Sequence, residues 1–494
     1  MQYVAFRADA STTLGGGHVR RCLSLARALR DCGVRTVFIS RAIDQVGPAL
    51  LSDQPLEVRW LLGPLEDDAQ ETATALRDVY PAWLVVDHYL LDRRWHESLH
   101  SRPGCKLAVI DDLADRPLAC DLLVDPNDPD AEAAYRPLLA SPAKVLGGPH
   151  FALLDPLYAV APRHVVRDEV KSIGIFMGTT DPTGACLPAL RGCREVAGFT
   201  GAIEVVCSPL APGYEPLAQA CAASPGTRLL TALPDLAAFF ARHDLQVGAG
   251  GGATWERCCI GPPTVACQVA ENQLATLPRL EAAGAGVWAR GEGDLAQSIG
   301  AIVAALLPDT DRRRSLNGAA LRLVDGRGCL RVAAVLACAA GAPLHMRAAD
   351  AGDEACLLAW ANDPVTRANA FNPERIAADQ HARWFASRLA SPDACRLFIA
   401  GAANGELVGQ VRFDRTPPGW EISYALAPHF RQLGLGTRLL ETALAQMPPA
   451  LFSGRVRTDN EVSARVFRKL GFNETEAEDQ RGRHRVFSRT SIKR

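Results

Sequence analysis

The chain has 494 residues, of which 48% are hydrophobic and 22% are charged. This length predicts about three domains at roughly 150 residues each, and the apolar fraction is that of an ordinary globular protein. The 53 basic and 55 acidic residues leave a formal net charge of −2. Such a balance excludes a bulk attraction to nucleic acid or to an acidic membrane.

The 15 cysteines are scattered and form no CxxC pair. A chain of this size needs no disulfides to hold its core, and paired zinc-ligand spacing is absent, so we expect buried thiols in a reducing compartment. The first residues lack a basic segment followed by a long apolar one, and the longest nearly apolar run, residues 332–344, is too short to span a bilayer. We therefore expect a soluble cytoplasmic protein that binds neither nucleic acid nor membrane.

Short β-branched runs alternate with amphipathic helical stretches over the first 340 residues. This alternation is typical of parallel sheets with helices on both faces. A pause at residues 125–167, rich in Pro, Asp and Ala, predicts a link between two doubly wound halves. The expected strands are residues 3–6, 36–39, 84–86, 107–110 and 122–124 in the first half, and 173–176, 203–207, 245–247 and 264–267 in the second.

The pattern changes near residue 343. A helix-rich opening at 351–390 precedes strands at 396–400, 407–413 and 421–425, and a helix is expected at 436–446. Consecutive strands joined by short turns favour antiparallel pairing. We predict an α/β protein with three domains: Rossmann-type halves at 1–160 and 161–342, then a domain at 343–494 whose mixed sheet is mainly antiparallel.

A glycine-rich turn leads from the first expected strand to the first helix. It contains Gly15, Gly16 and Gly17 and ends at His18. Glycines let a ligand approach the backbone, and the amides of a helix N-terminus bind anions, so phosphate or diphosphate is the expected ligand. The positive end of the helix dipole favours a neutral imidazole at His18, which can take a proton from water. A capping or packing role for His18 stays open at this point.

Acidic residues follow two further expected strands of the first half. In open α/β sheets, ligands gather outside the carboxyl ends of the strands. Aspartates at these positions are also preferred helix caps, so a purely structural role is the alternative. The candidates to orient His18 or to hold sugar hydroxyls are the endings with Asp87 and Tyr89 and with Asp111 and Asp112. Arg7 and Asp9, close to His18 in the chain, are further expected substrate contacts.

A second glycine run, from Gly248 to Gly252, precedes the helix expected at 255–260. Its amides are predicted to cradle a diphosphate, and Glu256, one turn into that helix, to accept both ribose hydroxyls. No lysine-bearing phosphate loop of the Walker type occurs, so ATP hydrolysis is not indicated.

The first 340 residues resemble the UDP-sugar hydrolase family of pseudaminic acid biosynthesis. The matching segments are 15–22, 87–92, 110–115, 146–147, 180–182, 250–258 and 270–273, with Tyr158 between them. One departure is Met177-Gly178-Thr179-Thr180, where the family more often has a Gly-Gly-Ser/Thr loop.

This resemblance implies a GT-B-like architecture, in which two Rossmann-type halves flank a cleft. It implies release of UDP from a 2,4-diacetamido-2,4,6-trideoxy-altrose nucleotide, with His18 as the catalytic residue and no metal. Amides of the glycine loops would stabilise the charge that gathers on UDP, while His18 activates water. The implied substrate contacts include Gly16, Gly17, Asp181, Gly251, Gly252, Thr254, Glu256, Glu271, Asn272 and Gln273.

A third glycine loop, from Arg431 to Thr437, lies between the strand at 421–425 and the next helix. A further helix, expected at 460–469, is followed by Leu470-Gly471-Phe472. With these two motifs, residues 344–489 resemble the acetyl-CoA-dependent N-acetyltransferases of the GNAT family. The resemblance implies acetyl-CoA as cosubstrate, bound at Leu426, Arg431, Gln432, Gly434, Leu435, Gly436, Thr437, Asn460, Ser463 and Phe467.

The acid–base residues of this domain are less well defined. Many GNAT enzymes place at position 467 a tyrosine that protonates the CoA thiolate, and Phe467 cannot donate a proton. Water, Ser463 or another group would have to replace it. Glu421 and Tyr424 are candidates to receive the proton of the amine, and a core role for Tyr424 is the alternative.

The two resemblances converge on consecutive reactions. One part would acetylate the 4-amino group of a UDP-linked amino sugar, and the other would then remove UDP by hydrolysis. The alternatives are a GT-B glycosyltransferase fused to a protein or amine N-acetyltransferase, and a regulatory module that binds nucleotide sugars without turnover. The sequence leaves the oligomeric state open.

Overall fold

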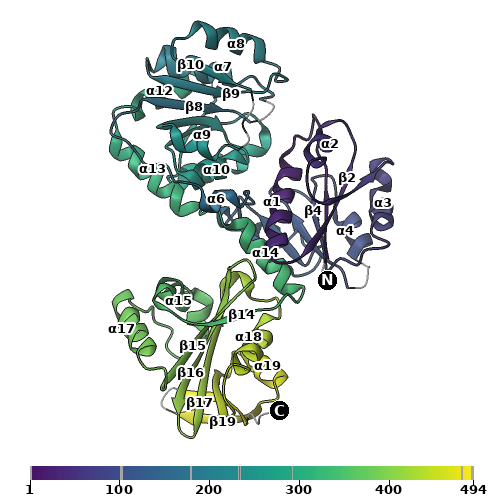
Figure 1. Ribbon diagram of the computed structural model, residues 1–494, viewed down its shortest axis with the longest axis vertical. Coiled ribbons are helices and arrows are strands. Elements are labelled where there is room, and N and C mark those ends of the chain that lie inside the picture. The colour runs from purple at the N-terminus through teal and green to yellow at the C-terminus, as the bar shows by residue number, and fades with distance from the viewer. Residues whose placement is uncertain are drawn as a thin grey trace. The chain divides into compact units, whose positions relative to one another are not determined.

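The computed structural model describes residues 3–100, 104–178, 181–231, 233, 235–291, 293–479 and 482–490, without the side chain of Asn272. Its contacts divide the chain into two compact units, Met1–Arg30 with Val34–Val332 and Asp31–Gly33 with Ala333–Arg494. The first unit contains two sheets and the second contains one (Figure 1). Because both sheets of the first unit fall in one compact body, the borders expected at 161 and 343 stay predictions.

The first sheet is parallel throughout, in the order β3-β2-β1-β4-β5-β6-β7. The chain winds outward from β1 in one direction and from β4 in the other, so the topological switch point lies between these two strands. Apolar residues of β1, β2, β4 and β5 form its core, among them Ala5, Ile39, Val86 and Val109. The strands are β1 (Tyr3–Ala8), β2 (Arg35–Arg41), β3 (Glu57–Leu61), β4 (Trp83–Asp87), β5 (Lys106–Ile110), β6 (Leu122–Asp125) and β7 (Lys144–Gly147).

Helices follow most of these strands, as a parallel sheet requires. The longest, α1, presents Val19, Leu25 and Leu29 to the interior and exposed arginines to solvent, which is the amphipathic pattern of a helix on a sheet. The helices are α1 (Gly17–Asp31), α2 (Val46–Leu51), α3 (Asp68–Ala75), α4 (Arg93–His100), α5 (Ala131–Tyr135) and α6 (Leu157–Val160).

The second sheet is also parallel, in the order β10-β9-β8-β11-β12-β13, with its switch point between β8 and β11. Its strands are β8 (Ser172–Phe176), β9 (Ala202–Val206), β10 (Thr227–Leu230), β11 (Leu245–Ala249), β12 (Thr264–Cys267) and β13 (Val287–Ala289). Its helices are α7 (Cys186–Arg191), α8 (Tyr214–Ala223), α9 (Ala237–Arg242), α10 (Ala253–Ile260), α11 (Leu277–Ala282), α12 (Leu295–Leu306) and α13 (Thr310–Leu323). Helix α14 (Gly328–Ala339) begins in the first unit and ends in the second.

The third sheet has the order β14-β15-β16-β17-β18-β20-β19, and it is antiparallel except for the pair β17–β18. Its strands are β14 (His345–Ala348), β15 (Cys395–Gly401), β16 (Leu407–Thr416), β17 (Gly419–Leu426), β18 (Leu451–Arg457), β19 (Asn473–Asp479) and β20 (Gly482–Thr490). Its helices are α15 (Glu354–Ala361), α16 (Pro364–Asn369), α17 (Ala378–Leu389), α18 (Leu435–Leu444) and α19 (Glu461–Lys469). The predicted fold class, two Rossmann-type sheets followed by a mainly antiparallel one, is confirmed.

The cysteines are free thiols, and all except Cys356 are buried, as expected. Within the described ranges, no helix combines the length and apolar character needed to cross a bilayer.

Candidate active sites

His18 lies at the switch point of the first sheet, on the second residue of α1 and beside the carboxyl end of β4. Its Nδ1 is 2.6 Å from Oδ1 of Asp87, the last residue of β4. Both side chains are buried, Asp87 completely. With Nδ1 directed at a carboxylate, Nε2 is the ring nitrogen left to accept a proton.

Arg21, one turn further along α1, fixes the carboxylate of Asp87. Its Nε and Nη2 donate to the two oxygens of Asp87 at 2.5 and 2.7 Å. Burial alone would raise the pKa of Asp87, but the charges and hydrogen bonds of Arg21 and His18 outweigh burial and hold that pKa below its ordinary value. Asp87 is therefore ionised, with both of its oxygens held by hydrogen-bonding partners. Arg21 was not among the predicted site residues, although its position one turn after His18 on the same helix was a usable signal.

Tyr89 and Asp112 complete this cluster. The Tyr89 hydroxyl donates to Oδ1 of Asp112 at 2.7 Å, and the Tyr89 ring meets the His18 ring edge to face at a centroid distance of 4.5 Å. Arg21 Nη1 reaches Oδ2 of Asp112 at 3.1 Å. Burial, followed by the charge of Asp112, raises the pKa of Tyr89, so its hydroxyl stays protonated.

The neighbouring Asp111 lies deeper than the prediction implied. It is fully buried and binds the Tyr135 hydroxyl at 2.5 Å and Arg116 at 2.6 Å. The residue of this aspartate pair that reaches the cluster is therefore Asp112, whereas Asp111 was the predicted substrate contact. Two successive residues at a strand end point in opposite directions, so the choice between them depends on a strand phase that the sequence left open.

Arg7 and Asp9 form a buried ion pair at the carboxyl end of β1. Two Arg7 nitrogens donate to Asp9 at 2.5 and 2.8 Å, and Arg7 also pairs with Asp68. His88 Nε2 is 3.3 Å from Asp9. Both Arg7 and Asp9 are at most 1% exposed, so in this structure they support the strand end and do not line a surface that a ligand reaches.

The first glycine turn leaves space for a ligand beside Gly17. Gly15 has φ +73° and its amide donates to the Ser11 carbonyl at 2.8 Å, which closes the turn. A Cβ at Gly17 would meet no atom within 4 Å, whereas one at Gly16 would touch Leu50. The free amides of the first turn of α1 therefore start at an exposed residue beside His18.

The second glycine run ends β11 at the switch point of the second sheet and leads into α10. A Cβ at Gly252 would be unobstructed and one at Gly251 would approach Gln273. Thr254 is 1% exposed, and its hydroxyl donates to the Ala249 carbonyl at 3.3 Å. The Thr254 hydroxyl thus stabilises the loop. The backbone of the glycines is the part of the loop that a diphosphate can approach.

Glu256 faces Tyr158, whose hydroxyl binds its carboxylate. Burial raises the pKa of Glu256 to about 7, against the hydrogen bond from Tyr158 and the charges of Arg257 and Arg20. Glu256 therefore combines partial burial with a place on the first turn of α10, next to the glycine loop.

The other predicted contacts of the second half differ in position. Asp181 is buried and accepts hydrogen bonds from the amides of Ala185 and Cys186 at the start of α7. Glu271 is exposed, and Gln273 is buried with its Oε1 accepting from the Val269 amide at 2.9 Å. The Asn272 side chain lies outside the described part of the chain, as do Thr179 and Thr180.

A group that includes Asp181 has the donor types of a metal site. Its ligand atoms and those of Cys186 and Cys207 lie within 4.8 Å of one another, and all three side chains are buried. Both Asp181 oxygens already accept hydrogen bonds from backbone amides at the start of α7. A helix-capping aspartate next to two buried thiols is therefore an alternative explanation of this group. The expected absence of a metal stays a prediction.

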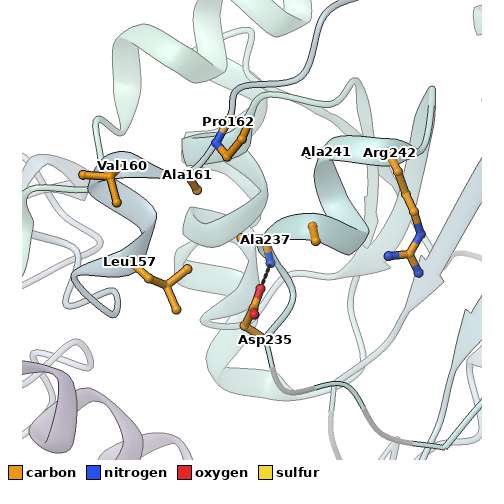
Figure 2. Close-up of a pocket in the computed structure, with 9 residues that line it drawn as sticks. Leu157, Val160, Ala161, Pro162, Asp235, Ala237, Ala241 and Arg242 are labelled. Carbon is orange, nitrogen blue, oxygen red and sulfur yellow. Dashed lines mark hydrogen bonds between the residues drawn. The ribbon is translucent and has the colours of Figure 1, made fainter.

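A cavity of about 580 Å³ lies elsewhere in the first unit, between α6 and α9. Its lining is mostly aliphatic, and the Asp235 carboxylate at its edge is engaged by the Ala237 amide (Figure 2). It holds none of the predicted site residues.

In the second unit, β17 and β18 separate shortly after they meet. They pair only at Trp420–Phe452 and Glu421–Ser453, so the rest of β17 leaves a gap in the ladder. Beyond the gap, Gly434 has φ +74° and precedes α18, whose first turn contains the buried Leu435 and Gly436 and the half-buried Thr437. A ten-residue helix with an open glycine at its N-terminus is suited to bind a pyrophosphate.

Arg431 and Gln432 shape this loop. Arg431 donates to Asp363 at 2.6 Å, to the Thr366 hydroxyl at 3.0 Å and to the Leu426 carbonyl at 3.3 Å, which ties the loop to α16. Gln432 is exposed and has φ +68°.

Helix α19 contacts α18 and reaches β17 through Ser463. Asn460 caps this helix by accepting from the Ser463 amide at 3.1 Å, and the Ser463 hydroxyl is 3.0 Å from the Tyr424 hydroxyl on β17. Burial raises the pKa of Tyr424 to about 12. A group that stays protonated in this way is a hydrogen-bond donor and a poor acceptor of the amine proton.

Phe467 lies in the hydrophobic core of the second unit and does not line the surface between β17 and β18. It is 1% exposed and stacks on Phe487 at 5.1 Å, and its ring tip would be 2.4 Å from a Cβ at Gly454. A tyrosine hydroxyl at this position would be crowded against the backbone at Gly454, which is consistent with phenylalanine at position 467.

Comparisons with known proteins agree with this division. Residues 358–472 match the model of the acetyltransferase (GNAT) family. Over 68% of its length the chain is 22% identical to the spore coat polysaccharide biosynthesis protein SpsG of Bacillus subtilis, of which it covers 97%. Over 36% of its length it is 26% identical to the UDP-2,4-diacetamido-2,4,6-trideoxy-beta-L-altropyranose hydrolase of Campylobacter jejuni, of which it covers 61%.

The structure of MurG from Acinetobacter baumannii superposes on 68% of the chain and 99% of its own length, with 13% identity and a TM-score of 0.50. The N-terminal region therefore has a GT-B-like fold. It is similar in sequence to SpsG and to the Campylobacter hydrolase, and it is fused to a GNAT acetyltransferase domain.

Proposed function

We propose that the N-terminal region hydrolyses a UDP-linked 2,4-diacetamido-2,4,6-trideoxy sugar and releases UDP. The observation that carries this proposal is the contact between His18 and the ionised Asp87 at the switch point, beside an open glycine turn. The similarity to the Campylobacter hydrolase supports the choice of substrate.

In the proposed reaction, His18 Nε2 takes a proton from water as the water oxygen bonds to the anomeric carbon. The bond from that carbon to the diphosphate oxygen breaks, and UDP leaves with the electron pair. Asp87 stabilises the imidazolium that forms, and the amides at the N-termini of α1 and α10 stabilise the charge on the diphosphate. Glu256 binds the ribose hydroxyls. No resident metal or cofactor is part of this proposal.

The GNAT domain, in this proposal, acetylates the 4-amino group of the UDP-linked precursor sugar. The amine nitrogen attacks the acetyl carbonyl of acetyl-CoA, the carbon–sulfur bond breaks, and the thiolate takes up a proton equivalent to the one that the amine loses. The open turn at Gly434 binds the CoA pyrophosphate, and the gap between β17 and β18 admits the chain that carries the acetyl group.

The test is to incubate the purified chain with acetyl-CoA and the UDP-4-amino sugar, without any glycan acceptor, and to follow CoA thiol and free UDP together. The proposal predicts thiol release first and UDP release after it. UDP release that requires an added acceptor would instead assign the N-terminal region to the glycosyltransferases. Thiol release that a panel of other amines supports better would exclude the sugar as the acetyl acceptor.

A further inference from the structure

Asn127 sits just beyond the carboxyl end of β6, in the same row of strand ends as Asp87. Its backbone amide donates to Oδ1 of Asp125, the last residue of β6, at 2.8 Å. Its side chain is buried, because the residue is 8% exposed. The position of this amide is therefore fixed by the strand end and not by solvent.

The side-chain amide of Asn127 makes two different hydrogen bonds. Its Oδ1 accepts from the indole Nε1 of Trp255 at 2.7 Å, and its Nδ2 donates to Oδ2 of Asp112 at 3.2 Å. An indole only donates and an ionised carboxylate only accepts, so these partners determine which end of the amide is oxygen. A primary amide meets both needs at once, whereas aspartate would place an acceptor against Asp112.

Each partner belongs to one of the two candidate subsites. Trp255 is on α10, between the glycine loop and Glu256, and it is 3% exposed. Asp112 holds the Tyr89 hydroxyl and Arg21, and Arg21 in turn holds Asp87, which orients His18. A continuous series of hydrogen bonds therefore runs from α10 to the imidazole.

We infer that Asn127 is a positioning residue of the hydrolase, which couples the nucleotide-binding helix α10 to the alignment of Tyr89 and Arg21 around His18. The inference rests on the proposed function. Asn127 touches neither the reacting atoms nor, in this account, the nucleotide itself. Its loss should therefore lower kcat while leaving KM for the nucleotide sugar nearly unchanged.

Two variants interrupt the series, one at Asn127 and one at Trp255. Asn127→Ala deletes both hydrogen bonds, and Trp255→Phe keeps an aromatic ring while deleting the indole N–H. Each should lower kcat for UDP release, Asn127→Ala by about 10- to 100-fold, since a hydrogen bond to a charged partner is lost. The double variant should be no slower than Asn127→Ala alone, because both changes act through the same link. Multiplied effects in the double variant would overturn the inference.

A pH profile separates positioning from a merely structural role. In Asn127→Asp, an ionised carboxylate would face Asp112, which Arg21 and Tyr89 bind from the other side, and it would lie next to Asp125, whose pKa burial already raises to about 7. Like charges at this distance make one of these carboxyls retain its proton to higher pH. The protonated form donates to Asp112 again. The ratio of variant to wild-type kcat should therefore rise as pH falls, by up to about tenfold per pH unit. A ratio that does not change with pH would overturn the inference.

Asn317→Asp is the matched control. Asn317 carries the same side-chain amide as Asn127, and its Nδ2 donates to the backbone carbonyls of Gly261 at 2.7 Å and His164 at 3.3 Å. It lies on α13, outside the series. After correction for the folded fraction, its kcat ratio should be independent of pH. The same slope in both variants would contradict a specific role for Asn127.

The link is also measurable without turnover. Unfolding of the full chain by urea should show that the destabilisations caused by Asn127→Ala and Trp255→Phe are not additive. Additive destabilisation would overturn the link even if UDP is released normally. Coupled destabilisation in a chain that releases no UDP from any UDP-sugar would keep the link and remove the hydrolase proposal.

Discussion

Glu256 is the residue whose ionisation should most directly change the affinity for the nucleotide. Burial raises its pKa to about 7 from the ordinary 4.5. The ionised form is the better acceptor for two ribose hydroxyls, so the Kd for UDP should rise as pH falls from 8 to 6. Calorimetric titration at several pH values checks this, and Glu256→Gln should bind more weakly and lose the pH dependence. A wild-type Kd that is constant over this range would contradict the assignment.

The same shift has a consequence for stability. A carboxyl whose pKa is higher in the folded state binds its proton more tightly there than in the unfolded chain. The contribution of Glu256 to the free energy of unfolding therefore decreases as pH rises from about 4.5 to about 7.

Phe467 yields a prediction about packing. Phe467→Tyr introduces the tyrosine that many GNAT enzymes have at this position, but the tyrosine hydroxyl would contact the backbone at Gly454. We expect a loss of about 1–3 kcal/mol in the free energy of unfolding and no gain in the rate of CoA thiol release. Urea unfolding and a thiol assay measure the two effects. A faster acetyl transfer with unchanged stability would show that position 467 faces the substrate.

Residue-level prediction from the sequence succeeded where a local rule applies. A glycine turn followed by a histidine, and an aspartate at a strand end, placed His18 and Asp87 in contact. It did not separate Asp111 from Asp112, because the direction of a side chain at a strand end depends on the strand phase. It also assigned Arg7 and Asp9 to the ligand, although the two pair with each other and Arg7 also binds Asp68, which is 61 positions away in the chain.

At the scale of elements, the helix N-termini that we propose as anion sites, those of α1, α10 and α18, each follow a glycine turn. The turn before α18 allows a clean test, because a Cβ at Gly434 meets no atom within 4 Å and Asn and Asp both tolerate positive φ. Gly434→Asp should weaken acetyl-CoA binding well beyond Gly434→Asn, by about tenfold or more, since a carboxylate repels the pyrophosphate. Equal affinities for the two variants, measured by calorimetry, would place the pyrophosphate elsewhere.

Elements with strong patterns were predicted, and short edge strands were not. The expected strands at 84–86, 107–110 and 245–247 lie within β4, β5 and β11, which are nearly fully buried and read as apolar runs. The strands β3, β7, β10 and β13 are at sheet edges and partly exposed, so they lack that run. Their pairing comes from the neighbouring strand and not from their own composition.

At the scale of the whole molecule, each compact unit carries one proposed site. When acetyl-CoA is kept well below the Kd of Gly434→Asp, His18→Ala and Gly434→Asp chains should each convert the UDP-4-amino sugar to free UDP far more slowly than the wild type. A mixture of the two should restore UDP release, because the acetylated intermediate made by one chain is hydrolysed by the other. Failure of the mixture, with each chain retaining its remaining activity, would show that the intermediate does not leave the chain that made it.

The central claim is that His18 activates water for UDP release, and the direct measurement is the turnover of His18→Ala with the acetylated UDP-sugar. The account predicts that UDP release falls by about 10²- to 10⁴-fold, while UDP binding, thermal stability and CoA thiol release from the amino sugar stay at wild-type levels. His100→Ala, at an exposed histidine on α4, is the control. Unchanged UDP release in His18→Ala would contradict the account.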